Sequence, residues 1–146
     1  ERMGKATKII AYISEEAEKR DCKVGLYNHG GWFGNPYNLV KIIEALPDKK
    51  EVGIIFNFHH AHDMLSEYPE LVKNMLPHLW AVNLNGMNPE GPKILTIGEG
   101  TEEKEMIEIL KKNGFNGPWG ILGHRTDADV KLVLKKNLEG LKKLTN

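Results

Sequence analysis

The chain has 146 residues, enough for one domain with a buried core, and its apolar and charged fractions are ordinary for a globular protein. Lysine and arginine together number 20, as do aspartate and glutamate, so the formal net charge is zero and nucleic acid is not expected as a partner. No apolar run approaches the roughly 20 residues of a membrane span, and the single Cys22 excludes an internal disulfide. The chain begins at Glu1 within a helical pattern, so we expect a soluble protein with a truncated amino end, and its compartment stays unknown.

The first half of the chain alternates helical and strand patterns. Residues 5–20 carry an apolar stripe at helical spacing, formed by Ile9, Ile10, Ile13 and Ala17. A short apolar run predicts a strand at 24–27, and another predicts a second strand at 52–56. Between them, Pro36 after the possible cap Asn35 predicts the start of a helix.

The second half continues the alternation. A looser helical region at 64–76 precedes a strand at 80–84, and a long loop rich in Gly, Pro and Asn covers 85–100. A helix over about 101–112 then leads to a strand at 119–122. The last helix, 127–144, is expected to bury Val130, Val133, Leu134, Leu138 and Leu141.

A leading helix followed by four βα units predicts an α/β fold with a parallel sheet and right-handed crossovers. A whole (β/α)8 TIM barrel needs about 250 residues, and at least about 200, so four units correspond to half of one. We therefore expect a single domain over residues 1–146, either half of a TIM barrel or a four-stranded open sheet.

Each predicted strand runs into a turn that contains Asn, His or both. Because the carboxyl ends of parallel strands hold the sites of α/β proteins, the four turns predict one pocket. The polar side chains concerned are Asn28, His29, Asn57, His59, His60, His62, Asn83, Asn85 and His124.

These turns resemble those of the xylose isomerase-like TIM barrels, the sugar phosphate isomerase/epimerase superfamily. Residues 26–31 resemble the family's Glu-Asn-His-Gly-Gly, and 56–61 its Phe-Asp-x-x-His-Ala. Residues 81–85 stand where the family has Val-His-Val-Lys-Asp, 97–100 resemble its Gly-Glu-Gly loop, and 114–119 the run before its last strand. The resemblance covers essentially the whole chain as the carboxyl-terminal half of the barrel, which holds its last four strands.

The resemblance implies a divalent metal ion held by Glu, Asp, His and Glu, one from each strand. This chain has Tyr27, Asn57, Asn83 and Leu122 (or Gly123) at the matching positions. Two of the lost carboxylates also transfer protons between sugar carbons in the family. The chain therefore resembles a divergent subgroup that lacks the usual metal ligands, and the usual isomerase mechanism does not carry over.

Histidine can act as a general base or acid near neutral pH, because its ordinary pKa is about 6.5. We expect His29, His60 and His124 to converge as catalytic residues. His60 and His62 share one side if the strand continues through them, which makes them candidate ligands for one divalent ion, Zn²⁺ or Mn²⁺. A site without a cofactor, in which Asn and His only bind a polar ligand or each other, is equally compatible with the pattern.

The expected substrate is a carbohydrate or sugar phosphate. Trp32 follows a Gly-Gly turn and either stacks on a sugar ring or packs its own loop. Arg125 is either an anion clamp or the ion-pair partner of Asp127 or Asp129. The candidate substrate-binding residues are Asn28, Trp32, Asn57, Asn83, Asn85, Glu99 and Arg125.

Together the residues and the resemblance predict a sugar isomerase/epimerase-like enzyme that abstracts a proton next to a carbonyl. The reaction would be isomerisation, epimerisation or elimination on a keto-sugar, the last as a keto-sugar lyase. The alternative is a non-catalytic carbohydrate-binding barrel that has lost its metal site. A half-barrel leaves two sheet edges open, so we expect a partner, either the missing amino-terminal half-barrel or a second copy of the chain.

Overall fold

The structure is a computed structural model that describes residues 1–123 and 125–145. Its sheet has the strand order β1-β2-β3-β4, and each neighbouring pair is parallel, as the alternation predicts. The strands are β1 (Val24–Tyr27), β2 (Val52–Asn57), β3 (Leu79–Leu84) and β4 (Trp119–Ile121). The α-helices are α1 (Arg2–Glu18), α2 (Gly31–Gly34), α3 (Pro36–Glu44), α4 (Tyr68–Met75), α5 (Glu103–Lys112) and α6 (Val130–Thr145). Short 3₁₀ helices are η1 (Phe58–His60), η2 (His62–Glu67) and η3 (Leu76–His78).

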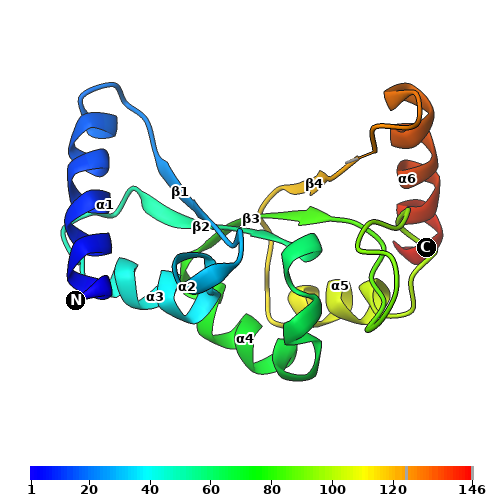
Figure 1. The fold of residues 1–146 in the computed structure, drawn as a ribbon, viewed down its shortest axis with the longest axis horizontal. Coiled ribbons are helices and arrows are strands. Elements are labelled where there is room, and N and C mark those ends of the chain that lie inside the picture. The colour runs from blue at the N-terminus through cyan, green and yellow to red at the C-terminus, as the bar shows by residue number, and fades with distance from the viewer. Residues whose placement is uncertain (124, 146) are drawn as a thin grey trace.

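The helices are arranged around the sheet as in part of a barrel (Figure 1). Helices α3, α4 and α5 lie along one face of the sheet, and α1 and α6 stand at its two opposite ends. Helix α1 packs on α3, α3 on α4, and α4 on α5. Among the described residues no helix is long and apolar enough to cross a membrane.

The hydrophobic core lies between the sheet and α3–α5. Alternate strand residues point into it and are almost completely buried, namely Leu26, Ile54, Phe56, Val82 and Leu84. Strand residues of the opposite parity, such as Tyr27, Ile55 and Asn83, are only half-buried. The face of the sheet turned away from α3–α5 is therefore more open, and side chains at its carboxyl end are accessible.

Helix α3 begins where the sequence predicts. The side chain of Asn35 accepts a hydrogen bond from the backbone amide of Tyr37 at 3.0 Å, and Pro36 occupies the first turn. The segment between the end of β1 at Tyr27 and the cap at Asn35 carries Asn28 and His29, and the cap fixes where this segment ends.

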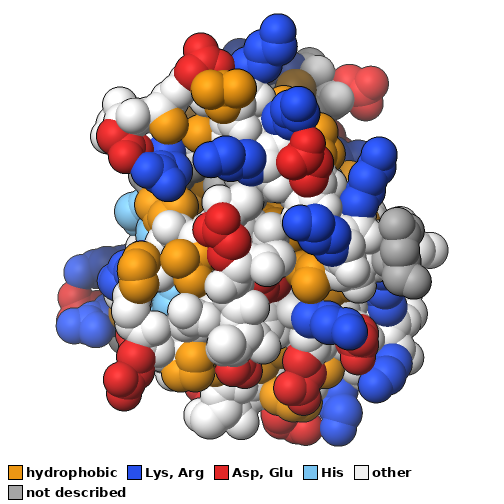
Figure 2. All heavy atoms as spheres, turned by 90° about the vertical axis from the view of Figure 1, so that its right-hand side faces the viewer, with side chains coloured by type: hydrophobic (Ala, Val, Ile, Leu, Met, Phe, Trp, Pro, Cys, Tyr) orange, Lys and Arg blue, Asp and Glu red, His pale blue; other side chains and the backbone are white. Residues whose placement is uncertain are grey.

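The inward faces predicted for the first and last helices are partly wrong. On α6, Val130, Leu134 and Leu138 are 74%, 47% and 47% exposed, and the helix begins at Val130 instead of residue 127. On α1, Ile9 and Ile13 are 58% and 42% exposed. Both helices lie at the ends of the sheet, so their apolar stripes extend past the elements that cover them in the described part of the chain. Figure 2 shows the α6 side, where apolar side chains lie among Lys and Arg.

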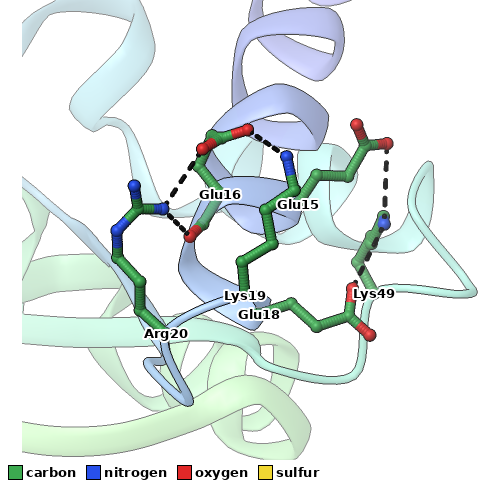
Figure 3. Close-up of polar contacts among 6 residues, drawn as sticks. All are labelled: Glu15, Glu16, Glu18, Lys19, Arg20 and Lys49. Atoms are coloured by element: carbon green, nitrogen blue, oxygen red, sulfur yellow. Dashed lines mark hydrogen bonds and ion pairs between the residues drawn. The ribbon is translucent and has the colours of Figure 1, made fainter.

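The carboxyl end of α1 is joined to the connection between α3 and β2. The Lys49 ammonium lies 3.6 Å from a carboxylate oxygen of Glu15 and 3.8 Å from one of Glu18 (Figure 3). Both carboxylates are largely exposed, so each pair contributes at most about 1 kcal/mol to stability. These pairs lie near the start of β1, at the end of the strands opposite to the candidate site.

Candidate active site

A pocket lies at the carboxyl end of the strands. Its lining consists of Tyr27, His29, Asn57, His59, His60 and Leu122. Tyr27 ends β1, Asn57 ends β2, and Leu122 follows β4, so the parallel sheet brings together residues that are far apart in sequence. The expectation that polar strand tips share one pocket is met for β1 and β2.

Asn28 and Asn57 connect the tips of β1 and β2. The Asn28 side chain accepts a hydrogen bond from the backbone amide of Asn57 at 2.7 Å and donates one to the backbone carbonyl of Asn57 at 3.0 Å. Both residues are buried, with exposures of 1% and 0%. Each is predicted to bind substrate; the bonds in the structure give Asn28 a positioning role beneath the pocket.

The side chain of Asn57 orients two neighbours. The side-chain NH₂ group of Asn57 donates a hydrogen bond to the Tyr27 hydroxyl, and its side-chain oxygen accepts one from the backbone amide of His59 at 3.1 Å. Because the Tyr27 oxygen accepts from Asn57, the hydroxyl hydrogen of Tyr27 can be donated to another group.

The bond from His59 also corrects a prediction. The chain leaves the sheet at Asn57 and turns through η1, so the strand does not continue, and the alternation that was expected to place His60 and His62 on one side is wrong. The turn instead brings the His60 ring close to the rings of Tyr27, at the end of β1, and His29, just after it. The His60 ring centroid lies 4.5 Å from that of His29 and 5.9 Å from that of Tyr27.

The long loop after β3 forms a hydrogen bond with His59, the second residue of η1. The Nδ1 atom of His59 donates to the backbone carbonyl of Lys93 at 3.0 Å, because a carbonyl can only accept. The His59 and His60 ring centroids are 4.6 Å apart. Three imidazoles, from His29, His59 and His60, thus gather at the pocket, and His124, the third predicted catalytic residue, lies outside the described residues.

His62 is half-buried and is absent from the lining of the pocket. Its Nδ1 donates to the His59 carbonyl at 3.0 Å, and its Nε2 atom is buried without a hydrogen-bond partner in the structure. Burial lowers the pKa of His62, and this effect exceeds that of the hydrogen bond to His59, which raises it. Within residues 1–123 and 125–145, no three or more His, Cys, Asp or Glu side chains are placed to hold a metal ion.

The tip of β3 contributes two amides with different surroundings. Asn83 pairs in register with Asn57 and with Gly120, where a Cβ atom would overlap the Asn83 side-chain oxygen. Gly120 thus leaves room for Asn83 beside the pocket. Asn85 is fully buried, and its amide donates to the Gly86 carbonyl at 2.9 Å, while its oxygen has no partner in the structure.

Sequence reasoning missed Glu103, the first residue of α5, which is fully buried. One carboxylate oxygen accepts from the amides of Gly98 and Gly100, both at 2.9 Å, and the other accepts from Met87 at 2.9 Å. Glu103 therefore fixes the long loop that also carries the His59 partner. The available signal was an acidic residue at a helix start after a glycine-rich loop, where amide hydrogens need acceptors.

The remaining predicted residues are absent from the lining of the pocket that contains His29 and His60. Trp32 is half-buried and packs on the core, which is the loop-packing alternative. Arg125 forms an ion pair with Asp127, with nitrogen–oxygen distances of 3.0 and 2.6 Å, again one of the stated alternatives. Glu99 and Arg125 line a second pocket against α6. Substrate binding by these residues stays a prediction.

The fold and the pocket define a unit of a βα-barrel with its polar site at the strand carboxyl ends. The chain matches the family described as xylose isomerase-like TIM barrel over residues 1–144 and belongs to that family. The recognition and the fold class expected from the sequence are thus confirmed. No curated protein matches the chain.

Solved structures of sugar epimerases share the fold. The chain is similar to 3-keto-D-glucoside 4-epimerase from E. coli, with 16% identity, a TM-score of 0.71, and coverage of 94% of this chain and 52% of that one. It is similar to a D-tagatose 3-epimerase-like protein at 28% identity, a TM-score of 0.63 and coverage of 95% and 55%. For D-psicose 3-epimerase from Clostridium cellulolyticum H10 the values are 14%, 0.70, 94% and 53%. The chain spans about half the length of these proteins.

Proposed function

We propose that the protein acts on a keto-sugar by removing a proton from the carbon next to the carbonyl. The observation that carries this proposal is the pairing of His29 and His60, whose ring centroids lie 4.5 Å apart and 6.2 and 5.9 Å from the ring centroid of Tyr27. Two imidazoles at this separation can face one small substrate. The names of the solved neighbours, two sugar epimerases and one epimerase-like protein, agree with this substrate class.

In the proposed step, one imidazole accepts the proton of the C–H bond next to the carbonyl. The electron pair of that bond forms the carbon–carbon double bond of an enolate, and the carbonyl oxygen takes the negative charge. The Tyr27 hydroxyl, oriented by Asn57, donates a hydrogen bond to this oxygen. The second imidazole then returns a proton to the same carbon, which gives epimerisation, or to the former carbonyl carbon while the proton of the neighbouring hydroxyl passes to the enolate oxygen, which gives isomerisation. In elimination, the enolate electron pair expels a leaving group from the next carbon, and the second imidazole protonates that leaving group.

The described residues do not fit a metal site of ordinary composition. Zinc sites use at least three protein ligands, whereas the predicted pair His60 and His62 supplies two, and the Nε2 atom of His62 is buried outside the lining of the pocket. Metal binding by this pair remains a proposal separate from the step above, which uses no metal. Elemental analysis of the protein and of His60→Ala tests it: one transition metal ion per chain, lost in the variant, would establish the site.

Hydrogen–deuterium exchange tests the chemistry directly. The protein at its natural full length is incubated in D₂O with 3-keto-D-glucose, D-fructose and D-tagatose, and deuterium next to the carbonyl is followed by NMR. We expect exchange, reduced about 10²- to 10⁴-fold in His29→Gln and in His60→Gln. His78→Gln is the matched control, because His78 lies in η3 just before β3, at the opposite end of the strands.

Exchange at the wild-type rate in both pocket variants would refute the proposal. Sugar binding without any exchange would favour the alternative, a carbohydrate-binding barrel without turnover. A thermal shift caused by sugar, measured on the same samples, separates binding from chemistry.

We also infer that a further (βα)4 unit, an amino-terminal half-barrel, covers the exposed apolar stripes of α1 and α6. The inference is supported by Ile9, Tyr12 and Val130, which are 58%, 66% and 74% exposed, and by the edge positions of β1 and β4 in the described sheet. Light scattering on the 146-residue chain tests it. A particle at 16.5 kDa that binds a hydrophobic dye supports this partner, whereas a stable particle of twice that mass favours a second copy of the chain.

A further inference from the structure

A second pocket adjoins the histidine pocket and has no role in the proposed step. It lies between loop residues 94–99 and the amino-terminal half of α6. Leu122 lines both pockets, so the two pockets adjoin at this side chain.

The walls of the second pocket are mainly aliphatic. They include Ile94, Leu95, Leu122, Leu132 and Val133. No aromatic ring is among the described residues that line it, although aromatic rings are what commonly stack on the faces of a second sugar. These walls match an apolar substituent better than a second carbohydrate ring.

Polar groups around the pocket are already paired. The buried Asn137 accepts from the Ile97 amide at 3.0 Å and donates to the Val133 carbonyl at 2.9 Å, so it holds the loop on α6. At Gly140 a Cβ would overlap the Ile97 carbonyl oxygen, which shows how closely loop and helix approach. The pocket thus has walls that are fixed from both sides.

The charges at the pocket rim do not favour a phosphate. Arg125 is engaged by Asp127 at 2.6 Å, and Glu99 contributes a negative charge that acts on Arg125. Lys136 also lines the pocket, but the two cations are balanced by the two carboxylates. An anionic substituent therefore meets no excess of positive charge at this rim.

We propose that the substrate is a keto-glycoside with an apolar aryl aglycone instead of a free keto-sugar or sugar phosphate. This inference rests on the proposed function: the keto-sugar ring occupies the histidine pocket, and the aglycone passes Leu122 and lies between Leu132 and the loop. Removal of the aryl group from water provides binding energy that a methyl glycoside lacks.

The test compares phenyl and methyl 3-keto-D-glucosides in the full-length protein, by deuterium exchange and by calorimetric binding. We expect kcat/KM for exchange to be about tenfold or more higher for the phenyl glycoside. Leu132→Asn should abolish this preference, because Leu132 is one wall of the pocket. The readout is the ratio of the two kcat/KM values, since a loss of folded protein lowers both values equally. Leu134→Asn is the matched control, since Leu134 is 47% exposed on the same helix and lines a different groove.

Equal kcat/KM for the two glycosides, or a preference that survives in Leu132→Asn, would overturn the inference while exchange itself upholds the proposed function. If no glycoside exchanges, the calorimetric preference decides: tighter phenyl binding that is lost in Leu132→Asn supports the pocket assignment without the chemistry, and equal binding overturns both.

Discussion

Replacement of Glu103 by glutamine isolates the contribution of one buried carboxylate to the architecture of the site. The two oxygens of Glu103 accept hydrogen bonds from the amides of Met87, Gly98 and Gly100. In Glu103→Gln, one oxygen becomes an NH₂ group, which cannot accept. At least one backbone donor loses its partner, and the remaining bonds lose the charge of the acceptor.

The expected cost follows from these bonds. Hydrogen bonds to charged groups contribute about 1.5–3 kcal/mol each, and neutral ones about half as much. The bond from exposed Gly98 contributes little to this cost, because water can replace the acceptor. One lost bond and one weakened bond therefore lower the free energy of unfolding by about 2–4 kcal/mol. For a chain of this size that corresponds to a fall in Tm of about 4–16 °C.

Urea denaturation of Glu103→Gln, with Glu105→Gln as the control, measures the effect. Glu105 is exposed in the same helical turn, so its loss of charge should change stability by less than about 0.5 kcal/mol. Hydrogen exchange should accelerate at Met87 and at Gly100. A Glu103→Gln variant that matches the control in stability and in loop exchange would show that the carboxylate does not fix the loop.

Three further predictions concern other buried contacts. Burial lowers the pKa of His62 in the folded protein. In the unfolded chain the pKa of this histidine is near 6.5, so the unfolded chain binds the proton more readily. The stability contributed by neutral His62 is therefore complete above about pH 6.5 and decreases as the pH falls toward the folded-state pKa. His62→Asn keeps a donor near the Nδ1 position, and its urea midpoint should fall less than that of the wild type between about pH 7.5 and about pH 5.5; an equal fall would contradict this assignment. Asn28→Ala should lower the free energy of unfolding by about 2–4 kcal/mol and speed exchange of the Asn57 amide, whereas a change below about 0.5 kcal/mol would count against the paired bonds. Gly140→Ala should lower Tm through overlap with the loop backbone, while Gly4→Ala, which has open space in α1, should raise stability by about 0.5–1 kcal/mol; a Tm shift in the same direction for both would refute the close approach.

The sequence predicted the fold well because its signals are local and repeated. Apolar runs followed by polar turns identify strands such as 24–27, and proline after a cap identifies the start of α3. Parallel pairing in sequence order then follows from the βα alternation alone. The inward faces of α1 and α6 could not be predicted in this way, since helical periodicity shows that a stripe is apolar but not which element covers it.

The candidate site was predictable only to the level of strand tips. The convergence of His29 and His60 follows from their positions after β1 and β2, and the structure contains it. Their catalytic roles stay predictions. The position of His62 depended on whether the strand continued past Asn57, and one side-chain bond from Asn57 to the next turn decides that. Glu103 was missed because an acidic residue at a helix start indicates only that amide acceptors are needed there, not which loop amides the carboxylate binds.

The Asn28 side chain has a consequence for the way loops attach to this sheet. Its carboxamide carries the same donor and acceptor as a peptide group, and it offers both to the backbone of Asn57. The Asn28 side chain therefore adds one further pair of hydrogen bonds to the β1–β2 pairing, although the main chain has already left the sheet after Tyr27. The last hydrogen bonds between this edge and β2 are therefore made by a side chain. The loop after Asn28 can change in length or direction without the loss of hydrogen bonds to β2. Such an arrangement lets the loop over the pocket diversify while the floor beneath it stays constant.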